Sequence, residues 1–174
     1  MTRKPNQRGQ AVIELAFQIP LMMLLLFGAV QIARVFYTYH ALHKILRGGA
    51  GMLGRSVNVN YCVAEDTALA DARNFMVYGN LQGEGSPVVA GLTTDMIQIL
   101  PERGTAGATD LNQCFCQDGA EDSDSCDILS GGRSPDFIVV NLGPGFPFQT
   151  SFPFVNLGTV DLRVSVRMPV TGGR

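Results

Sequence analysis

Acidic residues are scarce in the first third of the sequence. Residues 1–55 hold seven basic residues and one acid, Glu14, whereas residues 56–174 hold six basic and fourteen acidic residues. The larger part of the chain therefore lacks the basic surface that nucleic-acid binding needs. We expect a basic anchor, an acidic outer domain and no nucleic-acid partner.

Histidine and catalytic motifs are scarce as well. The only histidines are His40 and His43, so none lies in residues 56–174. A Gly-x-Ser-x-Gly elbow, a His-Glu-x-x-His pair and a phosphate-binding loop are all missing from the sequence. Two histidines three residues apart, without a nearby acid or thiol, supply only half of a zinc site. We expect no enzyme, no cofactor and no metal.

An apolar run at residues 11–33 follows a leader that carries Arg3, Lys4 and Arg8. A helix needs about 20 mostly apolar residues to cross a bilayer core of roughly 30 Å. The run meets that length and exceeds the apolar core of about 7 to 15 residues that a secretory signal peptide has. The positive-inside rule leaves the basic leader in the cytoplasm and the remainder of the chain outside. We expect a single pass through the inner (cytoplasmic) membrane.

Glu14 interrupts this apolar run five residues after Gly9. A carboxylate inside a membrane helix is costly, so such residues usually have a partner and a function. A plain signal anchor gives no reason for the acid. The alternative is a side chain that is protonated or reaches back to the nearby cytoplasmic interface.

The residues from Arg8 to Glu14, Arg-Gly-Gln-Ala-Val-Ile-Glu, resemble a type IV pilin signal. The longer string through Leu-Leu-Leu-Phe-Gly and Gln-Ile-Ala-Arg, within residues 8–54, is similar to the TadE-like minor pilins and pseudopilins of the Tad (tight adherence, Flp) pilus system. Members of that family often place a Glu before the Gly-Arg or Ala-Arg pair, where this chain has Gln31 and Ala33 before Arg34.

The resemblance implies cleavage between Gly9 and Gln10 by a prepilin peptidase. It further implies a minor subunit that helps to assemble or prime an adhesive pilus, with other pilin subunits and an inner-membrane assembly platform as partners. Cleavage would free an α-amine on Gln10, normally cationic at neutral pH, which Glu14 of a neighbouring subunit can neutralise. Such a pair sets register more than net stability, because desolvation of both ions offsets their attraction. The alternative is an uncleaved bitopic protein whose outer domain binds a ligand or partner.

Helical spacing continues beyond the membrane run. Apolar residues recur at positions 30, 33, 36, 37, 41, 45 and 46, which predicts one helix over residues 10–46. Pro20 predicts a kink. Gly48, Gly49, Gly51 and Gly54 predict a fraying end or a hinge near residue 55, and small residues also permit close helix packing. We divide the chain into a leader (1–9), a helix (10–54) and an outer domain (55–174).

The outer domain is long enough for one modest core. Apolar spacing predicts a helix over residues 63–78, stopped by Gly79. Short strands are predicted at residues 95–100 and 136–141, and strict alternation predicts one longer strand at residues 159–170. The expected fold class is α+β, in which a helix packs on an antiparallel sheet as in pilins.

Four cysteines, Cys62, Cys114, Cys116 and Cys126, all fall in the outer domain, where disulfides persist. Three pairings are possible. A bridge between Cys114 and Cys116 would close a very tight ring, so we favour Cys62 with one of that pair and Cys126 with the other. A metal site at the last three cysteines is the alternative, but zinc sites more often show two close pairs.

Two loops carry further patterns. Residues 118–127 crowd five carboxylates, which can hold calcium, although the spacing does not fit an EF-hand loop. A solvated acidic loop is the preferred interpretation. Residues 146–154 contain the triplet Phe-Pro-Phe twice. These rings either pack on the small sheet, which we prefer, or form an exposed contact patch.

Overall fold

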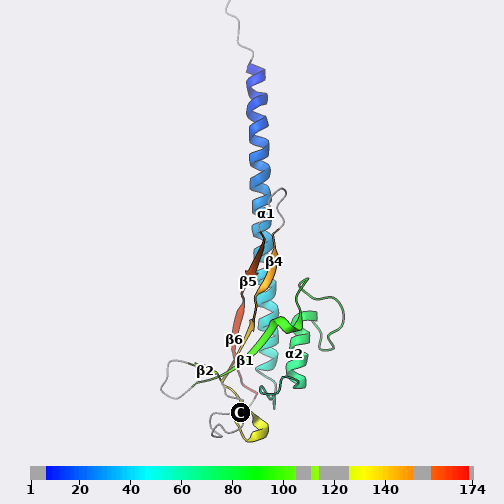
Figure 1. The fold of residues 1–174 in the computed structure, drawn as a ribbon, viewed down its shortest axis with the longest axis vertical. Coiled ribbons are helices and arrows are strands. Elements are labelled where there is room, and N and C mark those ends of the chain that lie inside the picture. The colour runs from blue at the N-terminus through cyan, green and yellow to red at the C-terminus, as the bar shows by residue number, and fades with distance from the viewer. Residues whose placement is uncertain (1–6, 105–110, 114–125, 151–157, 173–174) are drawn as a thin grey trace, which may run out of the picture.

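A single long helix carries a small domain against its C-terminal half (Figure 1). The computed structural model describes residues 7–104, 111–113, 126–150 and 158–172. The helices are α1 (Gln7–Leu53) and α2 (Thr67–Tyr78), with short 3-10 turns η1 (Thr94–Met96) and η2 (Ile128–Ser130). The strands are β1 (Ile97–Gly104), β2 (Leu111–Gln113), β3 (Phe137–Leu142), β4 (Phe146–Gln149), β5 (Thr159–Leu162) and β6 (Ser165–Pro169). This arrangement confirms the predicted α+β class.

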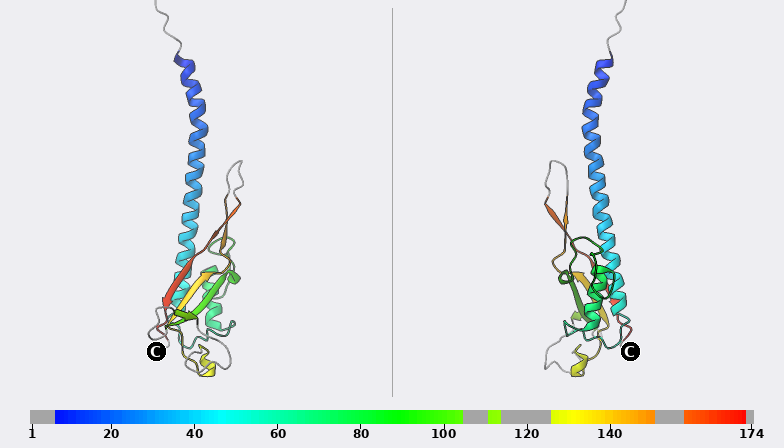
Figure 2. Two further views of the ribbon diagram at one scale, coloured as in Figure 1. Left: turned by 60° about the vertical axis from the view of Figure 1, so that its left-hand side comes forward. Right: turned by 90° about the vertical axis from the view of Figure 1, so that its right-hand side faces the viewer.

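Helix α1 runs without interruption for 47 residues. Pro20 lies inside it, and the helix curves only gently instead of kinking there (Figure 2). The predicted end at residue 46 is too early, because α1 continues through three of the four glycines to Leu53. The glycines therefore do not fray the helix, and it ends at Leu53, close to the position predicted for a hinge near residue 55.

The glycines of α1 allow close packing against another helix, as was also predicted for small residues. A Cβ atom on Gly49 would lie 2.6 Å from Met76 Sδ of α2, and one on Gly48 would lie 3.3 Å from the Phe75 ring. Real Cβ atoms essentially never approach at the first of these distances. Tertiary contact with α2 thus outweighs the low helix propensity of glycine.

Helix α2 has well-formed caps at both ends. The Asp66 side chain accepts a hydrogen bond from the Ala68 N–H at 2.9 Å, which satisfies one of the free N–H groups of the first turn. Gly79 adopts a left-handed conformation (φ 76°), and its N–H donates to the Phe75 carbonyl. The predicted stop at Gly79 is confirmed, while the helix begins four residues later than predicted.

The larger sheet has the strand order β2-β1-β3-β6 with antiparallel neighbours throughout. Helices α1 and α2 cover it, and one hydrophobic core joins all three. Side chains from both helices and the sheet are buried there: Leu42, Leu46, Ala50, Leu53, Leu69, Ala72, Met76, Ile138, Val140 and Val166. The C-terminal half of α1 is therefore a core element of the outer domain.

The region predicted as one strand at residues 159–170 forms two strands in different sheets. β5 pairs with β4, and β6 pairs with β3. The β3–β6 ladder ends at Asn141 opposite Ser165, and the β4–β5 ladder begins at Phe146 opposite Leu162. Four residues (142–145) thus face two (163–164), which forms a bulge that bends one long hairpin.

Glycines make this bulge possible. Gly145 has φ 86°, a conformation that a side chain disfavours, and a Cβ atom on Gly143 would lie 2.9 Å from Gln98 Oε1. The alternation of buried residues nevertheless continues through the bend at Leu162, Val164 and Val166. The sequence pattern for a single strand therefore persists where the strand itself is interrupted.

The first Phe-Pro-Phe triplet forms β4, and Phe146 and Phe148 are both buried in the core. Packing is confirmed for this triplet. The second triplet, the acidic residues 118–124, Cys114 and Cys116 lie outside the described residues.

Candidate functional site

The features predicted to act at the N-terminus all lie on α1. Gly9 is exposed within the helix, and a Cβ atom built there would meet nothing within 4 Å. Glu14 is exposed one and a half turns further along, about 7.5 Å up the helix axis from Gly9. Both positions are thus open on an extended helix, where another protein can reach them.

The segment around Glu14 is apolar and has almost no packing within the chain. Residues 11–27 are all exposed, including Val12, Phe17, Leu24 and Phe27. Soluble proteins rarely expose a continuous apolar surface of this length. Among the described residues, α1 is the one helix that is long and apolar enough to cross a membrane. The segment therefore fits a single-pass membrane helix.

Packing against the outer domain begins near Gln31, which is only 8% exposed. From there a narrow stripe through Val35, Leu42 and Leu46 faces the domain, while Phe36 and Tyr37 point outward and are 60% and 79% exposed. The sequence had placed the two aromatic residues in the same apolar series as Leu46. Phe36 and Tyr37 thus leave an exposed aromatic surface on α1, and Tyr37 also lines a pocket with Phe148 of β4.

A hydrogen-bond cluster below the C-terminal end of α1 positions Cys62. Asn60 is buried: its N–H donates to Asp66 Oδ2 at 3.0 Å, its Nδ2 donates to Asp127 Oδ1 at 2.8 Å, and its Oδ1 accepts from the Cys62 N–H at 3.0 Å. Asn60 therefore ties the chain after α1 to α2 and to η2. Neither Cys62 nor Cys126 is a free thiol.

Tyr61 lies in the same cluster and has a perturbed pKa. Burial, and then the negative charge of Asp66, raise the pKa of Tyr61 to about 12. Its hydroxyl donates to the Leu53 carbonyl at 3.3 Å, at the last residue of α1. This contact helps to hold the end of the long helix on the domain.

Arg103 is a buried cation beside Cys126. Its Nη2 lies 3.4 Å from Cys126 Sγ and also donates to the Arg133 carbonyl. Sequence patterns gave no signal for this position, because Arg103 follows Pro101-Glu102 at the end of a strand and resembles an exposed turn residue. The structure instead buries it beside Cys126.

The two histidines remain apart from any ligand set. His40 is exposed and stacks edge-on against Tyr39, with ring centroids 6.0 Å apart. In the part of the chain that the structure describes, no three His, Cys, Asp or Glu side chains gather closely enough to hold a metal ion.

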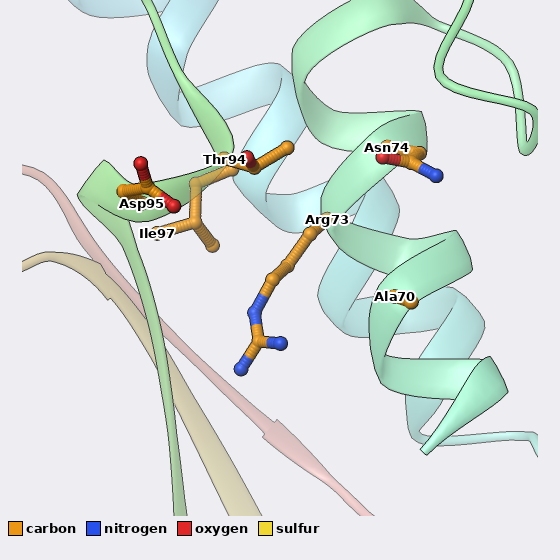
Figure 3. Close-up of a pocket in the computed structure, with 6 residues that line it drawn as sticks. All are labelled: Ala70, Arg73, Asn74, Thr94, Asp95 and Ile97. Atoms are coloured by element: carbon orange, nitrogen blue, oxygen red, sulfur yellow. The ribbon is translucent and has the colours of Figure 1, made fainter. Parts of the chain in front are cut away.

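An open polar cleft of about 440 Å³ separates α2 from η1 (Figure 3). Arg73 and Asn74 lie on one side of it, with Thr94 and Asp95 on the other. Arg73 donates to the Ala64 carbonyl, and Asn74 donates to the Leu81 carbonyl. Arg73 and Asn74 thus hold local backbone segments. The lining of the cleft is mostly polar, with Ala70 and Ile97 as its apolar residues, whereas small-molecule sites are predominantly apolar.

Residues 9–50 match the family model described as TadE-like protein. The N-terminal segment is TadE-like. The match covers Gly9, Glu14 and the stripe that packs on the outer domain, and it indicates a pilin-like protein associated with a Tad pilus. No curated protein and no solved structure matches the chain.

Proposed function

We propose that the protein is a minor pilin or pseudopilin of a Tad-type pilus, processed after Gly9. The observation that carries this proposal is the TadE-like match beginning at Gly9, on a helix whose residues 11–27 are all exposed. In this proposal, lipid covers residues 11–27 before assembly and other helices cover them afterwards.

Glu14 has a specific role in this proposal. After cleavage, the α-amine of Gln10 becomes the first group of the helix, and Glu14 of an adjoining subunit lies close enough to pair with it. The pairing aligns the subunits axially, because only one acid occurs along the span. The exposed position of Glu14 supports this role.

The outer domain is proposed to face away from the cytoplasm and to act structurally, without catalysis, in pilus assembly, priming or adhesion. Its partners would be other pilin subunits, the prepilin peptidase and the inner-membrane assembly platform. Two disulfides, Cys62 with one of Cys114 and Cys116 and Cys126 with the other, would stabilise it outside the cell.

The deciding experiment is the intact mass of the protein purified from membranes of a host with its own prepilin peptidase. We expect a chain that starts at Gln10, and a Gly9→Ala variant that retains the leader. Gly28→Ala is the matched control, because it changes another helical glycine at which an added Cβ atom would meet nothing within 4 Å. An uncleaved wild-type chain would reject the pilin proposal and favour the bitopic anchor.

A further inference from the structure

A groove runs between α1 and the β4–β5 hairpin, which diverge from each other in Figure 2. It has a volume of about 590 Å³, and Arg34 and Thr38 line it on the helix side. The strand side is formed by Phe146 to Gln149, and the floor by the loop at residues 89–91. This size is within the range of sites that bind small molecules.

The groove lies where the membrane span ends. A helix that enters the apolar core at Ala11 leaves it after about 20 residues, close to Val30. A second pocket, lined by Val30, Ala33 and Phe148, adjoins the groove and forms its apolar end toward the span. Arg34 and Thr38 line both pockets, so the guanidinium lies beside this apolar end.

Arg34 is an exposed cation in this groove. Both salt bridges found among the described residues involve other arginines, Arg133 and Arg167. Lys44, Arg47 and Arg55 follow Arg34 along the chain, and the next acid in the sequence is Glu65. Arg34 lies one turn beyond Val30 and so places its charge at the level of lipid headgroups, whereas Lys44 and Arg47 lie about 15 and 20 Å further along the helix.

We propose that the groove binds the headgroup of a membrane phospholipid. The Arg34 guanidinium donates hydrogen bonds to the phosphate, while Val30, Ala33 and Phe148 contact the first part of an acyl chain. The exposed Tyr37 ring lies at the depth where tyrosines commonly meet the membrane interface. The proposal rests on membrane anchoring and is independent of processing at Gly9.

A second copy of the chain is a poorer occupant on grounds of charge. The span offers one acid, Glu14, which lies 20 residues and about 30 Å along the axis from Arg34. A neighbour at the same membrane depth would therefore place no carboxylate of its span beside the guanidinium. A phospholipid brings its phosphate to that depth in every leaflet.

The test is lipid titration of the full chain in detergent, read by native mass spectrometry, with phosphatidylglycerol and phosphatidylcholine as probes. We expect Arg34→Gln to weaken binding of both lipids about tenfold, because it removes charge-assisted bonds to the shared phosphate. Ala33→Trp fills the apolar end and should weaken binding to a similar extent. Arg47→Gln, an exposed arginine on the same helix outside the groove, should change it less than about twofold.

Equal losses in Arg34→Gln and Arg47→Gln would show general charge attraction and overturn the site, as would unchanged binding in Arg34→Gln. A photocrosslinker at Thr38 should form a lipid adduct. A crosslinked protein dimer in its place would assign the groove to a second copy. Repeating the titration with Gly9→Ala separates the two proposals, because lipid binding is expected to persist when processing is blocked.

Discussion

The backbone of Gly49 in α1 lies directly against the Met76 side chain of α2, so close that an added Cβ atom would lie 2.6 Å from the sulfur. This contact packs the C-terminal part of α1 against α2 of the outer domain. A methyl group can be accommodated there only if Met76 or the helices move.

We therefore expect Gly49→Ala to lower the free energy of unfolding by about 1 to 3 kcal/mol through overpacking. The measurement is chemical denaturation of the full chain in detergent, followed by circular dichroism. Gly51→Ala is the matched control, because a Cβ atom there meets Met168 Cε at an ordinary 3.6 Å. That control should be neutral or up to about 1 kcal/mol more stable. Equal behaviour of the two variants would contradict the close-packing role of Gly49.

The raised pKa of Tyr61 predicts a loss of stability at alkaline pH. In the unfolded chain Tyr61 ionises near pH 10, whereas the folded protein holds the proton to about pH 12. Its contribution is thus complete below pH 10 and disappears between pH 10 and 12, by roughly 2 to 3 kcal/mol. Denaturation midpoints measured across this pH range should show the step in the wild type and lack it in Tyr61→Phe.

Two further variants sharpen this test. Asp66→Asn should lower the pKa of Tyr61 only in part, because burial is the larger cause and the charge of Asp66 the smaller. Tyr78→Phe should leave the alkaline step intact. A step that survives in Tyr61→Phe would assign it to another group.

Glu14→Gln should block assembly without blocking processing. Loss of the carboxylate leaves the new α-amine unpaired in an apolar environment, so we expect more than about a tenfold loss of the protein from sheared pilus fractions. Intact mass should still show a chain starting at Gln10. Gln18→Ala, an exposed polar residue one turn further on, is the control. Normal incorporation of Glu14→Gln would refute the pairing.

Removal of either described cysteine should destabilise the outer domain. We expect Cys62→Ser and Cys126→Ser each to cost about 2 to 4 kcal/mol, as for other native disulfides. Mass spectrometry of non-reduced peptides should link Cys62 to one of Cys114 and Cys116 and Cys126 to the other. A peptide that joins Cys114 directly to Cys116 would overturn this pairing.

Local patterns predicted most elements of the fold. The stop of α2 at Gly79 and strands close to β1 and β3 follow from turn residues and periodicity, which act over a few neighbours. The bend at residues 163–164 was missed because Leu162, Val164 and Val166 alternate without a break. The bulge that causes the bend lies on the partner strand, at residues 142–145. The alternation of residues within one strand cannot predict a bulge on the strand that pairs with it.

The candidate sites also differ in whether local sequence predicts them. Gly9 and Glu14 belong to one contiguous motif, so the sequence alone identified them as candidates. The groove at Arg34 needs β4, which lies more than 100 residues later in the chain. Helical spacing also grouped Tyr37 with Leu46, because both are apolar in character, and only the position of the sheet decides which of them is buried.

The continuity of α1 couples the anchor mechanically to the domain. The helix is continuous from Glu14 to Leu53, with no flexible linker between them. A force or torque applied to the N-terminal end of α1 is therefore transmitted directly to the outer domain. One residue inserted between Phe27 and Gln31 would turn the domain by about 100° relative to Glu14. In the proposed pilus, the rotation of α1 about its own axis would therefore set the direction in which each outer domain faces around the fibre.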